Sequence, residues 1–468
     1  MTNRLYQPCL FYFKPIHSYI LSLVIADALT QSIPQNTNYR WRICALLFIA
    51  TTICYVDRNV LSFTMIDDLF RREMLGLPAG AVLTDADVSR FKELMGYVDG
   101  AFKAAYAMGF LIVGYFIDRI GTKRGFSLSL ILWSVAGVLT GIVGSARGLS
   151  AVRFVLGIGE SGNFPSAVKA VAEWFPKKER SLAAGIFNAG ANVGIIITAL
   201  AVPYVTIHYG WRTAFVLTGV LGFVVLGLWR RVYRLPAQHP SVSSEELQYI
   251  QSDDDAQDER RILWRQMFRH RQTWAFCAGK FFADPIWYFY LTWLPDFFNS
   301  NESLQHKLDL KHIGLPFLVI YIVSDLGSIS FGWLSSRLIQ SGWSVNKARK
   351  FTMLICALCV MPIIIAASTT NIYLATGLIA LAAAAHQGWS ANNYTLASDM
   401  FPKQAVGSMV GIGSMMGAIS GAVFAASTGL IRVKFGYLPL FVIAGSAYLV
   451  ALLCIHLLVP RLEKVEMD

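Results

Sequence analysis

The chain has 468 residues, of which 55% are apolar, 13% aromatic and only 15% charged. A soluble domain carries roughly a quarter of charged residues, so this composition excludes a soluble globule of such a size. A net charge of +11 is also typical of proteins that bind nucleic acid. Here the basic residues lie in short loops between apolar blocks, where they orient a protein in the membrane. Nucleic acid is therefore excluded as a partner.

The first 39 residues differ from the rest and form an N-terminal extension of uncertain status. A short apolar segment at residues 19–29 contains Ala26-Asp27-Ala28 and loosely resembles a cleavable signal. Arg40 and Arg42 already make a good cytoplasmic flank for the first membrane span. We therefore favour an extension or a mis-assigned start over a cleaved signal.

Apolar segments of about 20 residues, the length that crosses a bilayer, recur from residue 40 onward. They predict twelve transmembrane helices, near residues 42–66, 94–117, 126–146, 148–171, 182–205, 212–230, 272–297, 313–337, 350–368, 371–395, 405–428 and 437–459. The longest polar stretch, 231–271, separates the sixth helix from the seventh. We predict an all-α membrane protein in a lipid bilayer, with six-helix bundles at 40–230 and 272–460 and a tail at 461–468.

Lysine and arginine are concentrated in the loops on one side of the predicted spans. Acidic residues contribute little to orientation, so this bias alone favours that side as the cytoplasmic one. The 231–271 stretch and both ends of the chain lie there. The sequence therefore predicts cytoplasmic termini and a cytoplasmic linker.

The two predicted halves repeat each other. Residues 174–177 (Trp-Phe-Pro-Lys) follow the fourth span, and residues 400–403 (Met-Phe-Pro-Lys) follow the tenth. The same offset takes Gly185 to Gly411, each in the following helix. Two parallel repeats are what an alternating-access carrier needs, with a site near the midplane and two bundles that rock about it.

Span one contains two adjacent charges, Asp57 and Arg58. Charges within the hydrocarbon core persist where they are paired or functional. Neighbouring helical residues point in different directions, so the two do not share one partner. We expect Arg58 to bind a substrate carboxylate, which suits its planar fork, and Asp57 to carry a proton. The alternative is a structural ion pair with another helix.

Span four places Arg153, Gly157, Glu160 and Asn163 on one helical stripe. A carboxylate in a low-dielectric cavity holds a proton more readily, so we expect Glu160 to be a proton carrier that Arg153 modulates. Asn163 is a candidate substrate contact. The alternative is a static Arg153–Glu160 bridge, although residues seven apart are too distant for a contact within one helix.

Lys103 is a further charge, in span two. It is expected either to add positive potential for an anionic sugar or to extend its charged end along its stem to the membrane surface.

Aromatic and polar side chains in spans seven and ten are further candidates for binding substrate. Span seven contains Trp287, Tyr288 and Tyr290, which offer flat faces and polar tips to a sugar ring, and two prolines that predict a kink. The alternative is an aromatic belt at the membrane interface. Span ten offers polar and aromatic groups that could bind hydroxyls or merely tie helices together, namely His386, Gln387, Trp389 and Asn393.

Charged residues in the loops after spans two and four are interpreted as a gate. We expect them to form an interhelical latch on the cytoplasmic side rather than to touch substrate. The predicted gating residues are Asp118, Arg119, Lys123, Arg124, Glu173 and Arg180.

The sequence lacks the usual enzymatic motifs. It has no phosphate-binding Gly-x-x-x-x-Gly-Lys and no zinc-binding His-Glu-x-x-His. Cys356 and Cys359 have redox-motif spacing but lie in mid-helix and are interpreted as packing residues. We expect no enzyme activity, no catalytic residue, no cofactor and no metal, so transport must use an ion gradient, for which protons suit Asp57 and Glu160.

Two sets of motifs resemble known transporters. The loop Gly114–Arg124, with Asp118, Arg119, Gly121 and Lys123, resembles the signature of the major facilitator superfamily. The narrower matches resemble the anion:cation symporter family and, within it, bacterial hexuronate transporters; they are residues 55–58 (Tyr-Val-Asp-Arg), 159–165 (Gly-Glu-Ser-Gly-Asn-Phe-Pro), 173–180, 187–190 and 385–387.

The resemblance implies the major facilitator fold and proton-coupled import of a small anionic sugar acid across a bacterial inner membrane. Hexuronates are the preferred substrates, and aldonates or other small carboxylates are the alternative. A transporter-like sensor of organic anions is an alternative of another class. We expect a monomer whose partners are the substrate, the co-transported proton and the lipid bilayer.

Overall fold

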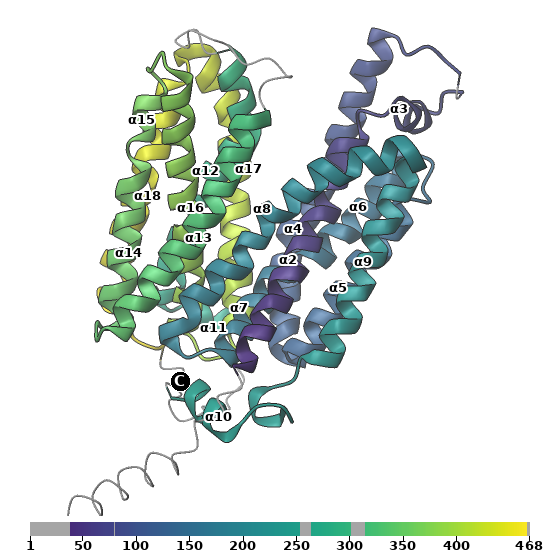
Figure 1. Ribbon diagram of the computed structural model, residues 1–468. Helices are drawn as coiled ribbons and strands as arrows, with labels where there is room; N and C mark the ends of the chain where they lie inside the picture. Colours follow the sequence, from purple (N-terminus) through teal and green to yellow (C-terminus); the bar gives the residue numbers. More distant parts are fainter. Residues whose placement is uncertain (1–37, 79, 253–263, 301–313, 466–468) are drawn as a thin grey trace, which may run out of the picture.

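A computed structural model describes residues 38–78, 80–252, 264–300 and 314–465, and the secondary structure in this part of the chain is helical (Figure 1). Nearly all of the predicted N-terminal extension and the acidic run at 253–255 lie outside the described residues.

The helices of the first half precede a short linker. They are α2 (Tyr39–Thr64), α3 (Asp68–Leu75), α4 (Asp85–Ile120), α5 (Thr122–Thr140), α6 (Ala146–Glu160), α7 (Asn163–Trp174), α8 (Lys177–Tyr209) and α9 (Trp211–Val232). The linker contains η1 (Pro236–Gln238), α10 (Ser244–Ile250) and α11 (Trp264–Met267). The second half comprises α12 (Arg271–Ser300), α13 (Gly314–Gln340), α14 (Val345–Val360), α15 (Ile363–Ala366), α16 (Ile372–Met400), α17 (Val406–Phe435) and α18 (Leu438–Leu458).

Each of the twelve predicted spans falls on a helix, but two are interrupted. The span predicted at 148–171 is broken between Glu160 and Asn163, because Pro165 has no N–H with which to continue the helical bonding. The span predicted at 350–368 is broken beside Pro362 for the same reason. Within the described residues, eight helices are long and apolar enough to cross a membrane.

The second predicted span begins earlier than expected. α4 starts at Asp85 instead of near residue 94, because Thr84 and Asp87 form a reciprocal capping box. The side chain of Thr84 accepts from the backbone of Asp87, and Asp87 Oδ2 accepts from the backbone N–H of Thr84 at 3.1 Å. This polar start lengthens α4 beyond its apolar stretch, at the end of the molecule where α3 lies (Figure 1).

The two halves form helical bundles that meet at the end where α10 and α11 lie and diverge towards α3 (Figure 1). We name these ends the linker end and the α3 end. α8 packs on α13 and α4 packs on α17 near the linker end, where Gly185 abuts Ser328 and Gly114 abuts Gly407. Glycine at such positions lets the helix backbones approach closely.

The linker is docked on the first bundle. The buried carboxylate of Glu246, in α10, accepts hydrogen bonds from the backbone N–H groups of Tyr39 at 2.9 Å and Arg40 at 3.1 Å. These donors begin α2 and have no partner within that helix. The side chain of Arg40 also joins Glu246 to Glu179 of α8. The linker helix thus caps the first transmembrane helix.

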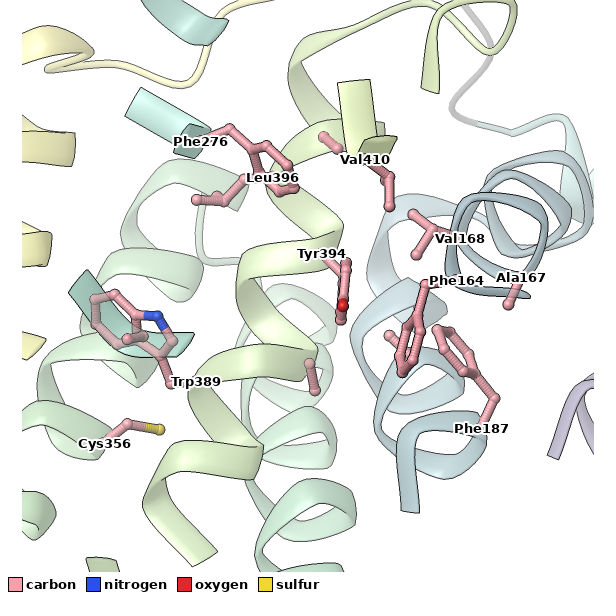
Figure 2. Close-up of a cluster of buried hydrophobic side chains, with 14 of the residues drawn as sticks. Phe164, Ala167, Val168, Phe187, Phe276, Cys356, Trp389, Tyr394, Leu396 and Val410 are labelled. Atoms are coloured by element: carbon pink, nitrogen blue, oxygen red, sulfur yellow. The ribbon is translucent and has the colours of Figure 1, made fainter. Parts of the chain in front are cut away.

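Aromatic side chains fill the interface between the bundles. Tyr394 of α16 stacks on Phe164 of α7, with ring centroids 5.2 Å apart and planes 17° from parallel. Phe187 of α8 lies on the other side of Phe164 at 6.1 Å, whereas Trp389 points away into the second bundle beside Cys356 (Figure 2). This apolar contact separates a polar region in the first bundle from one in the second.

Candidate functional site

The centre of the first bundle holds an ion pair between two helices. Arg58 of α2 donates from Nε to Oε2 of Glu160 at 2.8 Å, and the Glu160 side chain is fully buried. The guanidinium carbon of Arg58 lies 4.6 Å from the ring centroid of Tyr55 and 4.5 Å from that of Tyr106. Aromatic faces stabilise a cation held out of water.

The pair is incompletely satisfied. Arg58 Nη2 and Glu160 Oε1 are buried and have no hydrogen-bond partner among the described residues. A buried polar atom without a partner costs about 1–3 kcal/mol. The pair thus leaves one donor and one acceptor available to a bound anion or proton. The helix break after Glu160 positions its carboxylate at the junction of α6 and α7.

Arg153 supports the pair indirectly. It is buried, and its Nη2 donates to the backbone oxygen of Arg58 at 3.1 Å, while its guanidinium carbon lies 5.3 Å from the Phe102 ring. Glu160 is paired with Arg58, and within the described chain no ion pair joins it to Arg153. The alternative of a static Arg153–Glu160 bridge is therefore wrong, because seven residues separate the two along α6.

Asp57 points away from Arg58, into the first bundle. Its carboxylate is buried and lies against the packed glycines of α5 and α9, with Oδ1 only 3.2 Å from where a Cβ on Gly137 would lie. The Thr218 hydroxyl of α9 donates to the Phe215 oxygen at 3.1 Å. Neither carboxylate oxygen meets a partner in the described part of the chain. Asp57 and Glu160 thus occupy separate environments.

Two other predicted residues of the first bundle lie apart from Arg58. Asn163 donates to the Thr51 hydroxyl at 3.2 Å and is buried between α7 and α2. Lys103 is 68% exposed and pairs with Asp99 one turn earlier on α4, at 2.6 Å. Lys103 is thus exposed, with an acidic partner on its own helix face, and its expected role of adding positive potential for an anionic sugar stays a prediction.

The predicted aromatic site of spans seven and ten is packed inside the second bundle. His386 bonds the Tyr448 hydroxyl at 2.6 Å and stacks on Trp287 at 4.9 Å. Trp389 is buried and donates to the Gly279 oxygen at 3.3 Å. Tyr290 is also buried. The face of α16 that carries His386 and Trp389 is turned towards α12 and α18. The contacts of His386 therefore tie helices of the second bundle together, as the alternative interpretation predicted.

Of the other three predicted residues of the second bundle, Gln387 reaches the first bundle, whereas Asn393 and Tyr288 lie against helices of their own bundle. Gln387 accepts from Asn188 of the other bundle at 2.7 Å. Asn393 is buried beside Gly279, and its amide has no hydrogen-bond partner among the described atoms. Tyr288 is half-buried, and its ring lies against Gly421 of α17.

Sequence reasoning missed a second buried ion pair. Lys280 of α12 lies 2.8 Å from Asp284, one turn along the same helix, and donates to the Tyr394 hydroxyl at 3.2 Å. The signal was present, because a lysine within a predicted span needs a partner or a function.

The linker end contains the cross-bundle polar contacts expected of a gate, although through few of the predicted residues. Asp118 pairs with Lys169 at 2.6 Å and accepts from the backbone N–H groups of Gly407 at 3.1 Å and Ser408 at 2.5 Å. These two donors lie in the first turn of α17 of the other bundle, where a negative charge is favourable. Asp118 thereby joins α4 to α17.

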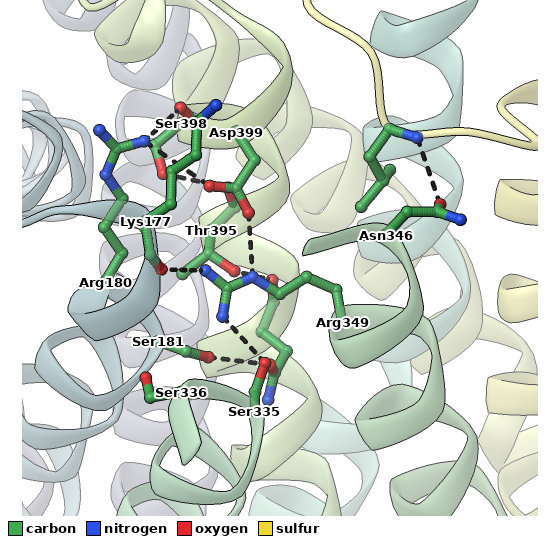
Figure 3. Close-up of polar contacts among 12 residues, drawn as sticks. Lys177, Arg180, Ser181, Ser335, Ser336, Asn346, Arg349, Thr395, Ser398 and Asp399 are labelled. Carbon is green, nitrogen blue, oxygen red and sulfur yellow. Dashed lines mark hydrogen bonds and ion pairs between the residues drawn. The ribbon is translucent and has the colours of Figure 1, made fainter. Parts of the chain in front are cut away.

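Arg180 and Arg349 join the bundles from opposite sides (Figure 3). Arg180 donates to the Ser398 oxygen at 2.8 Å. Arg349 pairs with Asp399 at 2.9 Å and donates across the interface to the Lys177 oxygen at 2.8 Å. The sequence analysis did not predict a gating role for Arg349, Asp399 or Lys169, because their partners come from distant helices.

The remaining predicted latch residues make their described contacts inside the first bundle. Glu173 accepts from the Thr122 hydroxyl at 2.7 Å and also bonds Tyr233. The guanidinium of Arg119 lies over Tyr115, and Lys123 accepts through its backbone oxygen from Trp229. Arg124 is exposed. Among the described contacts, Asp118 and Arg180 are the predicted residues that reach the second bundle.

Comparisons with known proteins identify the family. Residues 47–425 match the family model of the Major Facilitator Superfamily. The chain belongs to this superfamily. It is therefore a multi-pass membrane transporter and not an enzyme. The predicted fold is confirmed by its similarity to the solved proton:xylose symporter XylE, with a TM-score of 0.66 at 15% identity over 89% of this chain and 95% of that one.

Curated relatives agree with the predicted resemblance. The Hexuronate transporter of Escherichia coli (strain K12) is 28% identical over 433 residues, covering 91% of this chain and 95% of that protein. The D-galactonate transporter of Escherichia coli O6:H1 is 27% identical over 438 residues, covering 91% and 97%. The resemblance to hexuronate transporters of the superfamily is thereby confirmed.

Proposed function

We propose that this transporter imports sugar acids, hexuronates by preference, by proton symport with alternating access. The relatives named for hexuronate and D-galactonate support an acidic sugar as substrate. Aldonates are the alternative within the same class. The proposed location is a bacterial inner membrane, with the linker end and both termini on the cytoplasmic side, as the distribution of Lys and Arg favours.

The Arg58–Glu160 pair is the observation that carries the proposal. Arg58 is the cation that a substrate carboxylate would bind, and Glu160 is the anion that competes for it. Protonation of Glu160 would weaken its hold on Arg58 and free the guanidinium for the substrate. Binding of the proton and of the anion would then favour each other, as symport requires.

Asp57 would be a second proton site, because its carboxylate is buried without a hydrogen-bond partner in the described chain. It faces α5 and α9 and not Arg58, so the substrate could leave without displacing its proton. Arg153 would hold the backbone of Arg58 in place and add positive potential. Of the two proposed proton-binding acids, Glu160 would therefore lie beside the substrate and Asp57 would not.

The polar contacts at the linker end would act as the cytoplasmic gate. In this arrangement the gate is closed by Asp118, Arg180 and Arg349. The conformation would face outward, since the bundles diverge towards the α3 end (Figure 1). Opening would break hydrogen bonds to backbone atoms of the opposite bundle, which could reform when the bundles rock back.

Uptake of labelled glucuronate and galacturonate into proteoliposomes tests the proposal. The wild-type protein should accumulate substrate when the exterior of the vesicles is made more acidic than the interior. Glu160→Gln should exchange substrate across the membrane without accumulating it. Accumulation by Glu160→Gln against a gradient would contradict the coupling role. Specific binding without any flux would favour the sensor.

A further inference from the structure

The Lys280–Asp284 pair lies in the second bundle, opposite Arg58 and Glu160. Its side chains are 6% and 20% exposed, and the Lys280 ammonium also lies 4.5 Å from the ring centroid of Tyr394. Buried charges in a membrane protein are retained where they are paired or functional. This pair is held by one turn of α12 and by a tyrosine of α16, so its position is fixed within its own bundle.

Tyrosines connect this pair to the first bundle. Tyr394 bonds Lys280 and stacks on Phe164 of α7 (Figure 2). On the first-bundle side, the ring centroid of Tyr55 lies 6.4 Å from that of Phe164, and the guanidinium carbon of Arg58 lies 4.6 Å from the Tyr55 centroid. Two ion pairs, one from each bundle, are therefore joined by a continuous series of aromatic rings at the interface.

The two pairs offer different chemistry to a ligand. Arg58 keeps a buried guanidinium nitrogen without a partner in the described chain, and its acid is the proposed proton carrier. Lys280 is bound to both Asp284 and Tyr394, so its charge is offset. A neutral pair can exchange hydrogen bonds with hydroxyl groups, because ammonium donates and carboxylate accepts. It offers no net charge to a carboxylate.

Asn393 adds a donor and an acceptor beside the pair. It precedes Tyr394 on α16 and abuts Gly279, the neighbour of Lys280 on α12. The side chain is only 1% exposed, and both its nitrogen and its oxygen are without a partner among the described atoms. Neighbouring hydroxyls of a sugar supply the matching acceptor and donor.

We propose that Lys280, Asp284, Tyr394 and Asn393 bind the hydroxyl-bearing end of the substrate, and that the neutrality of Lys280–Asp284 selects sugar acids with one carboxylate over those with two. This rests on the proposed function, in which Arg58 binds the first carboxylate. A second carboxylate would lie beside Asp284 with no cation free to compensate it, and like charges without compensation oppose binding. Hexuronates and aldonates fit this rule, and aldarates do not.

Binding of glucuronate and glucarate to the purified full-length protein tests the rule. Wild type should prefer glucuronate, which has one carboxylate. Asp284→Asn leaves Lys280 as a net cation, so the preference should fall by about tenfold or more. The double variant Lys280→Gln/Asp284→Asn is neutral again and should restore the preference, with weaker affinity for both ligands.

A matched control and a variant of opposite sign accompany these proteins. Asp68→Asn breaks an exposed ion pair with Arg71 on α3 and should leave both affinities unchanged. Lys280→Gln leaves Asp284 as a net anion and should raise the preference for glucuronate, which provides a test if Asp284→Asn does not fold. Equal losses for both ligands in the two single variants would assign the pair a purely structural role and overturn the inference.

The same measurements separate the inference from the proposed function. A wild-type protein that binds neither ligand would contradict both. A wild type that binds glucuronate, with a ratio that no Asp284 or Lys280 variant changes, would overturn the selectivity rule alone. A wild-type preference for glucarate would do the same.

Discussion

Two arginine–carboxylate pairs, Arg58–Glu160 in the first bundle and Arg349–Asp399 at the linker end, differ in how many of their polar atoms have a hydrogen-bond partner. Arg349 uses three guanidinium nitrogens, bonding Asp399 at 2.9 Å, the Ser335 hydroxyl at 2.8 Å and the Lys177 oxygen at 2.8 Å. Within the described chain, the guanidinium of Arg58 makes one hydrogen bond, from Nε to Glu160.

The difference separates a pair that holds helices from one that is open to a ligand. An arginine whose three nitrogens are all hydrogen-bonded within the protein holds its helices together, so removing it chiefly leaves its buried partner without a cation. An arginine with unused donors can bind a second anion at little cost in structure. Substitutions at the two sites should therefore have different consequences, namely for stability at Arg349 and for substrate affinity at Arg58.

Arg349→Ala should have the largest effect on stability. It leaves Asp399 buried without its main cation, and breaking a buried pair from one side costs about 3–5 kcal/mol. Thermal unfolding in detergent should show a large drop in Tm. Arg349→Ala/Asp399→Ala should lose less than the sum of the two single variants, and strict additivity would contradict a coupled pair.

Arg58→Lys should lower substrate affinity about 100-fold, because lysine keeps the charge but loses the planar fork that binds a carboxylate in two places. Calorimetric titration with glucuronate measures the change. Thermal unfolding should remain close to that of the wild type, in contrast to Arg349→Ala. Unchanged affinity would remove Arg58 from the site.

Asp118→Asn should shift the balance between the two gate states. It removes the ion pair with Lys169 and weakens the contacts to Gly407 and Ser408, which together should favour an open linker end by about 1–2 kcal/mol. Spin labels placed on α4 and α17 at this end report the change by their distance distribution. A distribution identical to wild type would exclude Asp118 from the gate.

His386→Phe tests the packing role of a residue expected to bind substrate. The Tyr448 hydroxyl would lose its partner, so stability should fall by about 1 kcal/mol. The KM for uptake should change less than about twofold, since no group that contacts substrate is removed. A large rise in KM with normal stability would return His386 to the binding site.

Lys103→Gln should have the smallest effect, below about twofold in uptake rate, because exposed ion pairs contribute little. Its partner Asp99 lies on the same exposed helix face. Proteoliposome uptake at two salt concentrations checks this. A loss comparable to that of Arg58→Lys would show that α4 contributes a cation to the substrate path.

The sequence by itself determined the membrane-spanning architecture. The length of the apolar segments matches the thickness of a bilayer, so each span can be predicted from its own residues. The polar 231–271 stretch and the repeated Trp-Phe-Pro-Lys and Met-Phe-Pro-Lys segments divide the spans into two halves. The same logic singled out Asp57, Arg58 and Glu160, because a charge within a span is unusual wherever its side chain points. The broken fourth span was missed, although Pro165 was a local signal for it.

Only the tertiary structure decided which charged groups meet. Helical periodicity places residues on a face of their own helix, but the rotation of one helix against another is set by packing of side chains far apart in sequence. Glu160 therefore pairs with Arg58 and not with Arg153, Arg349 reaches Lys177 of the other bundle, and His386 turns inward to Tyr448. Lys280 and Asp284 are one turn apart on α12, yet their position opposite Arg58 depends on how two separately packed bundles come together.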